Sequence, residues 1–295
     1  MVTVRKKTTE GRTYYYLEHS VKVDGHVENR SKYLGTKIPK DIENMKSDFL
    51  WKIYSEKWFK KLDGIKENYF REFKKIPKEV REKFLQDFMV KFTYNSNRIE
   101  GSSLSLHDNV KLLVDGTSPK EKPVSDIKEA ESHKKVFYKM LEYKSDLNLE
   151  TILFWHKELF GETKSNLAGK IRNYQIIVTG SKAQFPFPAE LNVLLREFFK
   201  WYEKNKSELH PVVLAALVHF KFVSIHPFGD GNGRVSRLMM NFVLHKHGYP
   251  MLNITYKNRS SYYNALERAQ LKNLNHVFVT YLIRRYLKDY KKYLK

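Results

Sequence analysis

The segment from Pro211 to Ile225 constrains the fold of this chain more than any other. Apolar residues fill nearly every position between its ends: Val212, Val213, Leu214, Ala215, Leu217, Val218, Phe220, Phe222 and Val223. A helix that is apolar on every side has to be surrounded by protein, because a surface helix keeps one polar face. The sequence therefore predicts a central, buried helix with other helices packed around it, in a mainly α protein.

A glycine-rich stretch, residues 226–237 with the sequence HPFGDGNGRVSR, follows the buried helix directly, and a second apolar helix comes after it. Gly231 and Gly233 allow the backbone to take positive φ and to approach a ligand closely. Consecutive N–H groups in such a turn form a concave site for an anion. The second helix should begin near Asn232, so its N-terminus points at the same place.

Charged side chains complete this stretch. Arg234 and Arg237 are three residues apart and share a helical face, where guanidinium groups can bind phosphate oxygens. Asp230 is a hard oxygen ligand suited to Mg²⁺ shared with phosphates, and His226 can take a proton near neutral pH. A glycine-rich helix cap with Asp and Arg on a solvated face would explain any one of these residues. As a set, they supply what phosphoryl-type transfer needs.

The stretch matches the Fic signature H-x-F-x-[D/E]-G-N-G-R-x-x-R at every defined position, and residues 95–270 resemble the Fic family. The resemblance implies a Fic-type helical bundle with a β-hairpin flap. It also implies roles: a general base (His226), a loop anchor (Phe228), a Mg²⁺ ligand (Asp230), contacts to the α- and β-phosphates (Gly231, Asn232, Gly233), a β-phosphate contact (Arg234) and a γ-phosphate contact (Arg237).

The resemblance further implies a protein adenylyltransferase, which moves AMP from Mg²⁺-bound ATP to a Tyr, Thr or Ser hydroxyl of a target protein. One branch of the family has Lys at the position of Gly233 and transfers phosphate instead, so Gly233 favours AMP transfer. In some relatives the same site also removes AMP, and the sequence does not choose between the two directions.

A second motif precedes this domain. Ser96 to Gly101 resembles the family's inhibitory motif [S/T]-x-x-x-E-[G/N], here on a helix expected over residues 85–101. Ser96 and Glu100 are four residues apart and share a helical face. The resemblance implies that Glu100 pairs with Arg237 and denies the γ-phosphate its contact. The alternative is an ordinary helix end with Gly101 as its cap.

Two further segments resemble family elements. Residues 174–187 are predicted to form a hairpin, with a strand at 174–178 and a turn at 179–181, and resemble the flap on which a target segment docks by backbone pairing; a purely structural hairpin is the alternative. Residues 259–266 resemble the segment that lines the adenine pocket. Tyr262 or Tyr263 could stack there or pack in the core, and we select Tyr263.

The rest of the chain gives an expected division. Residues 1–40 are rich in strand formers, with a hairpin turn at Asp24-Gly25, and form a small β unit that could recognise a target or make a homodimer. Residues 41–94 are predicted to be a helical linker region, 95–272 the Fic domain, and 273–295 a basic helix, docked by its leucines or binding a partner.

Composition adds limits. The formal net charge is +21, from 54 Lys and Arg against 33 Asp and Glu, which favours anionic partners. A nucleic-acid-binding regulator that only senses ATP is therefore the alternative function, although solvated lysine-rich faces explain the charge equally well. Cysteine is absent, which excludes disulfides and thiolate metal sites. No apolar leader or 18-residue apolar run exists, so we expect a cytoplasmic protein without membrane spans.

Overall fold

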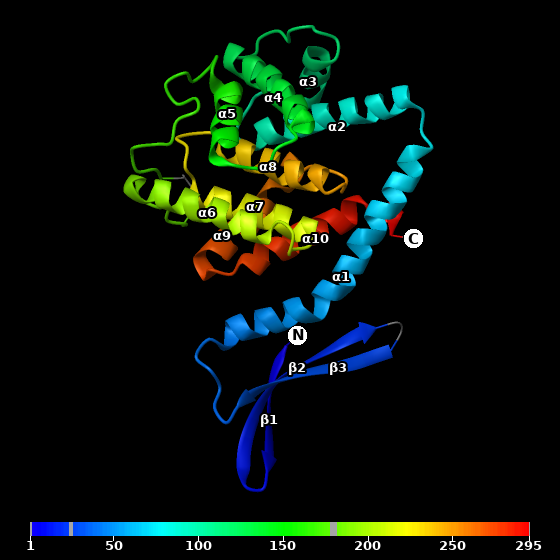
Figure 1. The fold of residues 1–295 in the computed structure, drawn as a ribbon, viewed down its shortest axis with the longest axis vertical. Coiled ribbons are helices and arrows are strands. Elements are labelled where there is room, and N and C mark those ends of the chain that lie inside the picture. The colour runs from blue at the N-terminus through cyan, green and yellow to red at the C-terminus, as the bar shows by residue number, and fades with distance from the viewer. Residues whose placement is uncertain (1, 24–25, 178–181, 295) are drawn as a thin grey trace. The chain divides into compact units, whose positions relative to one another are not determined.

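The computed structural model describes residues 2–23, 26–177 and 182–294 and is mainly helical, as predicted (Figure 1). The chain divides into two compact units, Met1–Gly64 and Ile65–Lys295. Helix α1 (Ile42–Lys74) begins in the first unit and ends in the second. The four-part division expected from the sequence stays a prediction.

The first unit contains an antiparallel sheet of strand order β1-β2-β3, with β1 at Thr3–Thr9, β2 at Arg12–Val23 and β3 at His26–Gly35. Leu17 lies opposite Val4 on β1. Leu17 packs in a small core with Val2 and with Phe49 of α1, so the first part of α1 covers this face of the sheet. The small N-terminal β unit is thus confirmed. The turn at Asp24-Gly25 lies outside the described residues.

The second unit is a bundle of helices, and its longest connection, residues 161–190, joins α5 to α6. Its elements after α1 are α2 (Lys78–Ile99), α3 (Leu106–Leu113), α4 (Val124–Glu142), α5 (Leu149–Phe160), α6 (Leu191–Asn205), α7 (Pro211–Ile225), α8 (Asn232–Lys246), α9 (Arg259–Lys272) and α10 (Asn275–Asp289). Single 3₁₀ turns lie at Pro188–Glu190, Tyr256–Asn258 and Lys291–Tyr293. Among the described helices, none is both long and apolar enough to cross a bilayer.

Helix α7 is the centre of this bundle, as its all-round apolar pattern predicted. Leu214, Ala215 and Phe222 are completely buried, and α7 packs against α6, α8 and α10. In Figure 1, α7 and α8 lie between α4 and α5 on one side and α9 and α10 on the other. Pro211 occupies the first turn, where its missing N–H costs nothing. Two central helices therefore hold the loop that joins them.

Helix α8 is also buried along nearly its whole length, although its sequence is not apolar throughout. It buries Arg234, Ser236 and Arg237 as well as its apolar residues. The helix ends at Lys246, and Gly248 follows with a φ of +68°, as expected for a glycine stop. Buried arginines need partners, and these partners are supplied by other helices, as described below.

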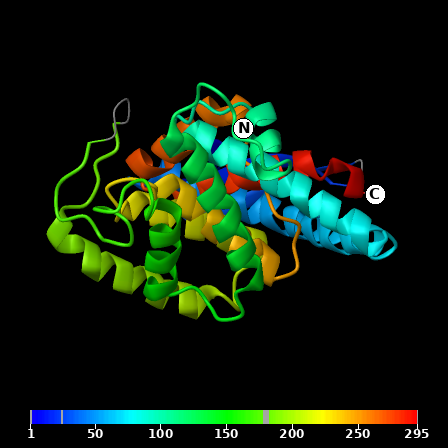
Figure 2. The same ribbon diagram turned by 90° about the horizontal axis from the view of Figure 1, so that it is seen from above.

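The predicted hairpin over residues 174–187 requires correction. The described parts, 174–177 and 182–187, form no strand ladder with each other, and the turn at 179–181 lies outside the described residues. One reason is that Pro186 has no N–H to donate to a ladder. Another is that the Arg172 guanidinium binds the carbonyls of Tyr174 and Pro186, at 2.8 and 2.7 Å. We call these two parts the flap limbs; Figure 2 shows the segment between α5 and α6 looping out beside the helices.

Candidate active site

His226 begins the loop between the two central helices. It is the residue that ends α7, and its left-handed backbone conformation (φ 52°, ψ 57°) turns the chain away from the helix axis. Its side-chain Nδ1 lies 3.1 Å from the carbonyl oxygen of Val223. A carbonyl can only accept, so Nδ1 carries the proton and Nε2 carries a lone pair. Burial lowers the pKa of His226 to about 4, so the imidazole is neutral at pH 7 and can act as a base.

Phe228 and Asn232 fix the loop from inside. Phe228 is buried, and its ring stacks on His156 with centroids 3.8 Å apart. The Asn232 side chain binds both the backbone N–H and the carbonyl of Phe228, at 2.9 and 2.8 Å. The anchoring position expected for Phe228 is therefore observed. The Asn232 amide therefore holds the loop in place, and a phosphate contact from this residue stays a prediction.

Gly231 and Gly233, the two glycines that the sequence singled out, are required for different reasons. Gly231 has a φ of +83°, and a Cβ there would lie 2.3 Å from the Phe160 ring. Gly233 lies in the first turn of α8 with ordinary helical φ, so the expectation of positive φ at this position was wrong. What Gly233 provides is space, because a Cβ would lie 2.2 Å from Oε1 of Glu100. Replacement of either glycine by a residue with a Cβ would therefore force a neighbouring side chain to move.

Asp230 is ionised and surrounded by cations. Its Oδ2 lies 2.6 Å from Nζ of Lys164, and its Oδ1 lies 3.1 Å from Nη2 of Arg234. Burial by itself would raise the pKa of Asp230, but Arg234 and Lys164 outweigh it and lower the pKa to about 2. The Lys164 ammonium also lies 2.8 Å from Oε1 of Glu129. Two carboxylates and two cations therefore form one network at the base of the loop.

Asp230 is the natural candidate for the Mg²⁺ that the resemblance implies. The described residues contain no group of three or more acidic or histidine side chains that could hold a metal by themselves. Mg²⁺ is commonly held by one or two carboxylates together with substrate phosphates, so a single ionised Asp230 beside a phosphate site fits. The Lys164 ammonium forms an ion pair with this carboxylate at 2.6 Å, at the place where the ion would bind.

Arg234 is almost completely buried, with a relative exposure of 4%. It pairs with Glu129 of α4 and with Asp230, and its guanidinium carbon lies 4.3 Å from the centroid of the Phe160 ring. Glu129 and Lys164 were not identified from the sequence, because they lie far from the loop in the chain and belong to no motif. The contact of Arg234 with a β-phosphate stays a prediction.

Arg237 is held by helix α2. Its side chain is 1% exposed. Its Nε donates to Oγ of Ser96 at 2.9 Å, and its Nη2 donates to the carbonyl of Ser96 at 3.0 Å and to Oε1 of Glu100 at 2.7 Å. Within the described ranges Nη1 has no hydrogen-bond partner. The structure thus contains the contact between Glu100 and Arg237 that the resemblance implied, and Ser96 adds two contacts to the same guanidinium.

The two tyrosines at the start of α9 lie in different surroundings. Tyr262 is buried in the core, where its hydroxyl lies 3.1 Å from Nε2 of the equally buried His219. Tyr263 is 44% exposed, and its hydroxyl donates to the carbonyl of Ile99 at 3.2 Å. Burial, with the nearby Glu100 carboxylate, raises the pKa of Tyr263 to about 12. Tyr263 is thus the tyrosine beside the site; its contact with adenine stays a prediction.

Two buried side chains that the sequence did not single out orient the loop. The Nδ1 atom of His156 accepts from the N–H of Gly169 at 2.8 Å, so its Nε2–H donates to the carbonyl of Asp230 at 3.0 Å. Arg172 donates through Nε to the carbonyl of His226 at 2.9 Å. Because Arg172 also binds both flap limbs, the flap and His226 are fixed to the same guanidinium.

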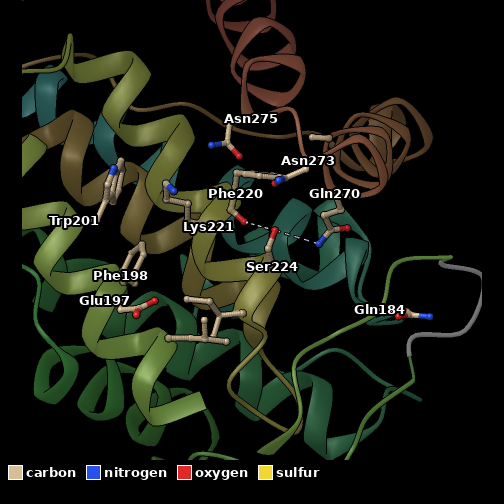
Figure 3. A pocket seen from close by; sticks show the side chains of 13 residues that line it. Gln184, Glu197, Phe198, Trp201, Phe220, Lys221, Ser224, Gln270, Asn273 and Asn275 are labelled. Atoms are coloured by element: carbon tan, nitrogen blue, oxygen red, sulfur yellow. Dashed lines mark hydrogen bonds between the residues drawn. The ribbon is translucent and has the colours of Figure 1, made fainter. Parts of the chain in front are cut away.

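A pocket of about 420 Å³ opens beside the end of α7 that carries His226 (Figure 3). Ser224 and Ile225, the two residues before His226, line it together with Gln184 of the second flap limb. The remaining lining residues come from α6, α7, α9, the residue Asn273 that follows α9, and the first turn of α10. This pocket was not predicted, because its walls come from segments that are far apart in the sequence.

Comparison with known proteins agrees with this geometry. Residues 146–244 match the Fic/DOC family. The chain is 37% identical over 182 residues to the protein named Protein adenylyltransferase Fic of Drosophila melanogaster, a match that covers 60% of this chain and 36% of the relative. The same protein of Drosophila virilis is also 37% identical over 182 residues, which are 60% of this chain and 37% of the relative. The chain thus spans little more than a third of the length of these curated relatives.

Solved structures share the fold. A Fic domain containing signaling protein from Bacteroides thetaiotaomicron superimposes with a TM-score of 0.71 at 27% identity, covering 79% of this chain and 97% of that protein. Fic-1 from C. elegans gives a TM-score of 0.73 at 22% identity, covering 86% and 76%, a likeness of fold alone. A buried helix, a glycine-rich loop and a second buried helix, together with the family match, define a Fic-type domain over residues 146–244 of this chain.

Proposed function

We propose that this chain transfers AMP from ATP to a hydroxyl side chain of a target protein, and that Glu100 restrains the reaction. The observation that carries the proposal is the position of Arg237, whose Nη1 lies 3.0 Å from the Cβ position of Gly233 and whose guanidinium is held by Ser96 and Glu100. The relatives that are 37% identical are named protein adenylyltransferases, which supports this choice of reaction.

His226 would start the reaction. Its Nε2 takes the proton of the target hydroxyl, and the hydroxyl oxygen attacks the α-phosphorus of ATP. A new oxygen–phosphorus bond forms while the bond from the α-phosphorus to the bridging oxygen breaks, and pyrophosphate leaves with the electron pair. The proton is held on the imidazole. The fixed Nδ1 contact with Val223 keeps Nε2 as the basic nitrogen throughout.

The loop and the start of α8 would bind the phosphates. The backbone N–H groups at Gly231, Asn232 and Gly233 lie at the N-terminus of a buried helix, where the helix dipole favours an anion. Arg237 would contact the terminal phosphate. A Mg²⁺ ion held by Asp230 would neutralise phosphate charge and stabilise the charge that develops on the leaving group.

The restraint follows from charge and space. The Glu100 carboxylate binds the Arg237 guanidinium, which the terminal phosphate would otherwise contact. The carboxylate and that phosphate are both negatively charged, so they would repel each other. The Glu100 side chain also lies close to the start of α8: a Cβ at Gly233 would be only 2.2 Å from Oε1 of Glu100. Removal of the carboxylate would give Arg237 back to the nucleotide.

The flap would position the target. Because no backbone ladder joins 174–177 to 182–187 in the described chain, both limbs keep backbone groups that an extended target segment could use. The Arg172 contacts hold these limbs at a fixed place relative to His226.

Incubation with Mg²⁺ and ATP carrying a label on either the α- or the γ-phosphate tests this proposal. We expect Glu100→Gly to acquire α-label, on itself or on an added protein, and to exceed the wild type at least tenfold. The double variant Glu100→Gly with His226→Ala should acquire none. Glu142→Gly, at the exposed end of α4, is the matched control and should behave as the wild type.

Transfer of the γ-label alone would mean that the chain transfers phosphate and not AMP. Absence of both labels from the Glu100→Gly protein and from added proteins would contradict the proposal. A further incubation of labelled product without ATP tests the reverse activity. Loss of label that depends on His226 would show that the same site also removes AMP.

A further inference from the structure

The pocket beside His226 is open and of mixed polarity, with a cation on one wall. Lys221 of α7 lines it, one helical turn before Ile225, and Figure 3 shows its side chain among those of Trp201, Phe220 and Ser224. Its Nζ lies 4.8 Å from the centroid of the Trp201 ring. This cation–π contact holds the ammonium against α6 at the edge of the pocket.

Lys221 is a partly desolvated cation without an acidic partner. Burial lowers its pKa, and no ion pair to it exists among the residues that the structure describes, although Glu197 lines the same pocket. An uncompensated cation in such a place costs free energy, which an incoming carboxylate would offset. Glu197 balances this charge over the pocket as a whole, so a carboxylate is favoured only at the end of the pocket where Lys221 lies on Trp201.

The other polar groups of the pocket suit a peptide backbone. Gln184, Asn273 and Asn275 line the pocket with amide side chains, which make no side-chain hydrogen bond to the described residues. Gln270 donates to Oγ of Ser224 at 3.2 Å and keeps its carbonyl oxygen. Each amide offers both donors and acceptors, which matches the alternating N–H and C=O groups of an extended chain.

We propose that this pocket binds an acidic segment of the target protein, with a target carboxylate on Lys221, and thereby selects targets whose acceptor hydroxyl has acidic neighbours. The inference rests on the proposed function. Its geometric basis is continuity: Gln184 precedes Phe185, whose ring lies 4.4 Å from that of His226, and Ser224 is two residues before His226. A segment that follows the second flap limb from His226 therefore reaches the pocket within a few residues.

Synthetic peptides test the selection. Each contains one Tyr in a Gly/Ser background, with three Glu or three Lys placed on one side of it, in both orientations. With Glu100→Gly protein and ATP, we expect a lower KM for one orientation of the acidic peptide. Adding Lys221→Ala should raise that KM about tenfold and leave kcat unchanged, as expected for loss of one charge-assisted contact. Lys221→Glu should transfer the preference to the Lys peptide.

Lys200→Ala, on an exposed position of α6, is the matched control and should change neither constant. The result that overturns the inference is an equal KM for acidic and basic peptides, or a preference that Lys221→Glu leaves in place.

Binding without chemistry separates this inference from the proposed function. The same peptides with Phe in place of Tyr, carrying a fluorophore, report binding to wild-type protein by anisotropy. Binding of the acidic peptide that Lys221→Glu abolishes supports the docking site even if AMP transfer fails. Displacement of the peptide by ATP, together with weaker ATP binding by Lys221→Ala, would instead make the pocket a nucleotide site and overturn the docking proposal.

Discussion

Glu100 and Arg237 are 137 residues apart in the chain, yet Oε1 of one lies 2.7 Å from Nη2 of the other. Glu100 follows the last residue of α2, where that helix ends against α8. Ser96, one turn earlier, adds two more contacts to the same guanidinium. Arg237 is therefore fixed at three points, and only the Glu100 contact carries charge.

Gly233 gives a stability test of this contact. In the wild type, an Ala Cβ at this position would displace the Glu100 carboxylate from Arg237, and the loss of a charged hydrogen bond costs about 1.5–3 kcal/mol. Without Glu100 the Ala Cβ would still lie 3.0 Å from Nη1 of Arg237, the end of a flexible side chain that can shift, and the Ala removes a helical glycine, a gain of up to about 1 kcal/mol. We expect Gly233→Ala to lower the free energy of unfolding in the wild type and to raise it in Glu100→Gly.

Urea unfolding of the four proteins in this cycle measures the effect. An equal change in both backgrounds would show that Glu100 does not crowd Gly233. The Gly→Ala substitution at Gly64, on α1 with open space around its Cβ position, serves as the control for helix propensity alone.

Lys164 should weaken divalent-cation binding at Asp230. Its ammonium lies within 2.8 Å of carboxylate oxygens of both Asp230 and Glu129, so it supplies the positive charge that a metal would otherwise supply. We expect Lys164→Met to bind Mn²⁺ without nucleotide at least tenfold more tightly than the wild type, measured by calorimetry. Lys128→Met removes a comparable but exposed partner of Glu162 and should leave Mn²⁺ binding unchanged. An unchanged Mn²⁺ affinity of Lys164→Met would show that Lys164 does not compete with the metal for Asp230.

His226 should remain neutral well below the usual range of histidine. Burial lowers its pKa to about 4, against about 6.5 for an exposed imidazole. The proton is bound more weakly in the folded state, so stability is lost as pH falls below about 6.5 towards 4. We expect the ring-proton NMR signal of His226, assigned with His226→Ala, to show no titration between pH 8 and 5.5. A midpoint near 6.5 would mean that the ring is solvated.

Arg172 should control the order of the flap limbs. Its guanidinium donates to three carbonyls, those of His226, Tyr174 and Pro186. A lysine keeps the charge but cannot span three acceptors. We expect Arg172→Lys to speed amide hydrogen exchange in residues 173–177 and 182–187 about tenfold, with no change in α7. Arg196→Lys, at an exposed position of α6, should leave exchange as it is; equal rates in both variants would contradict this role.

The part of the site that was predictable is local in sequence. His226, Asp230, Gly231 and Arg237 lie within twelve residues that the loop and one helical turn bring together, so their spacing alone indicated a phosphate site. Helix α7 was equally predictable, because a segment that is apolar all round has one stable environment. The pairing of Glu100 with Arg237 came from a motif rather than from physical reasoning.

The sequence by itself determined that a buried helix and a second apolar helix flank a glycine-rich turn, because periodicity and glycine spacing are local properties; phosphate binding by this turn stays a prediction. Only the tertiary structure decided that Lys164 and Glu129 surround Asp230, that Gly233 serves space rather than backbone conformation, and that Arg172 binds the flap limbs in place of a strand ladder. These relationships join segments distant in the chain, and which distant side chains meet depends on how the helices pack, a cooperative property that local patterns do not encode.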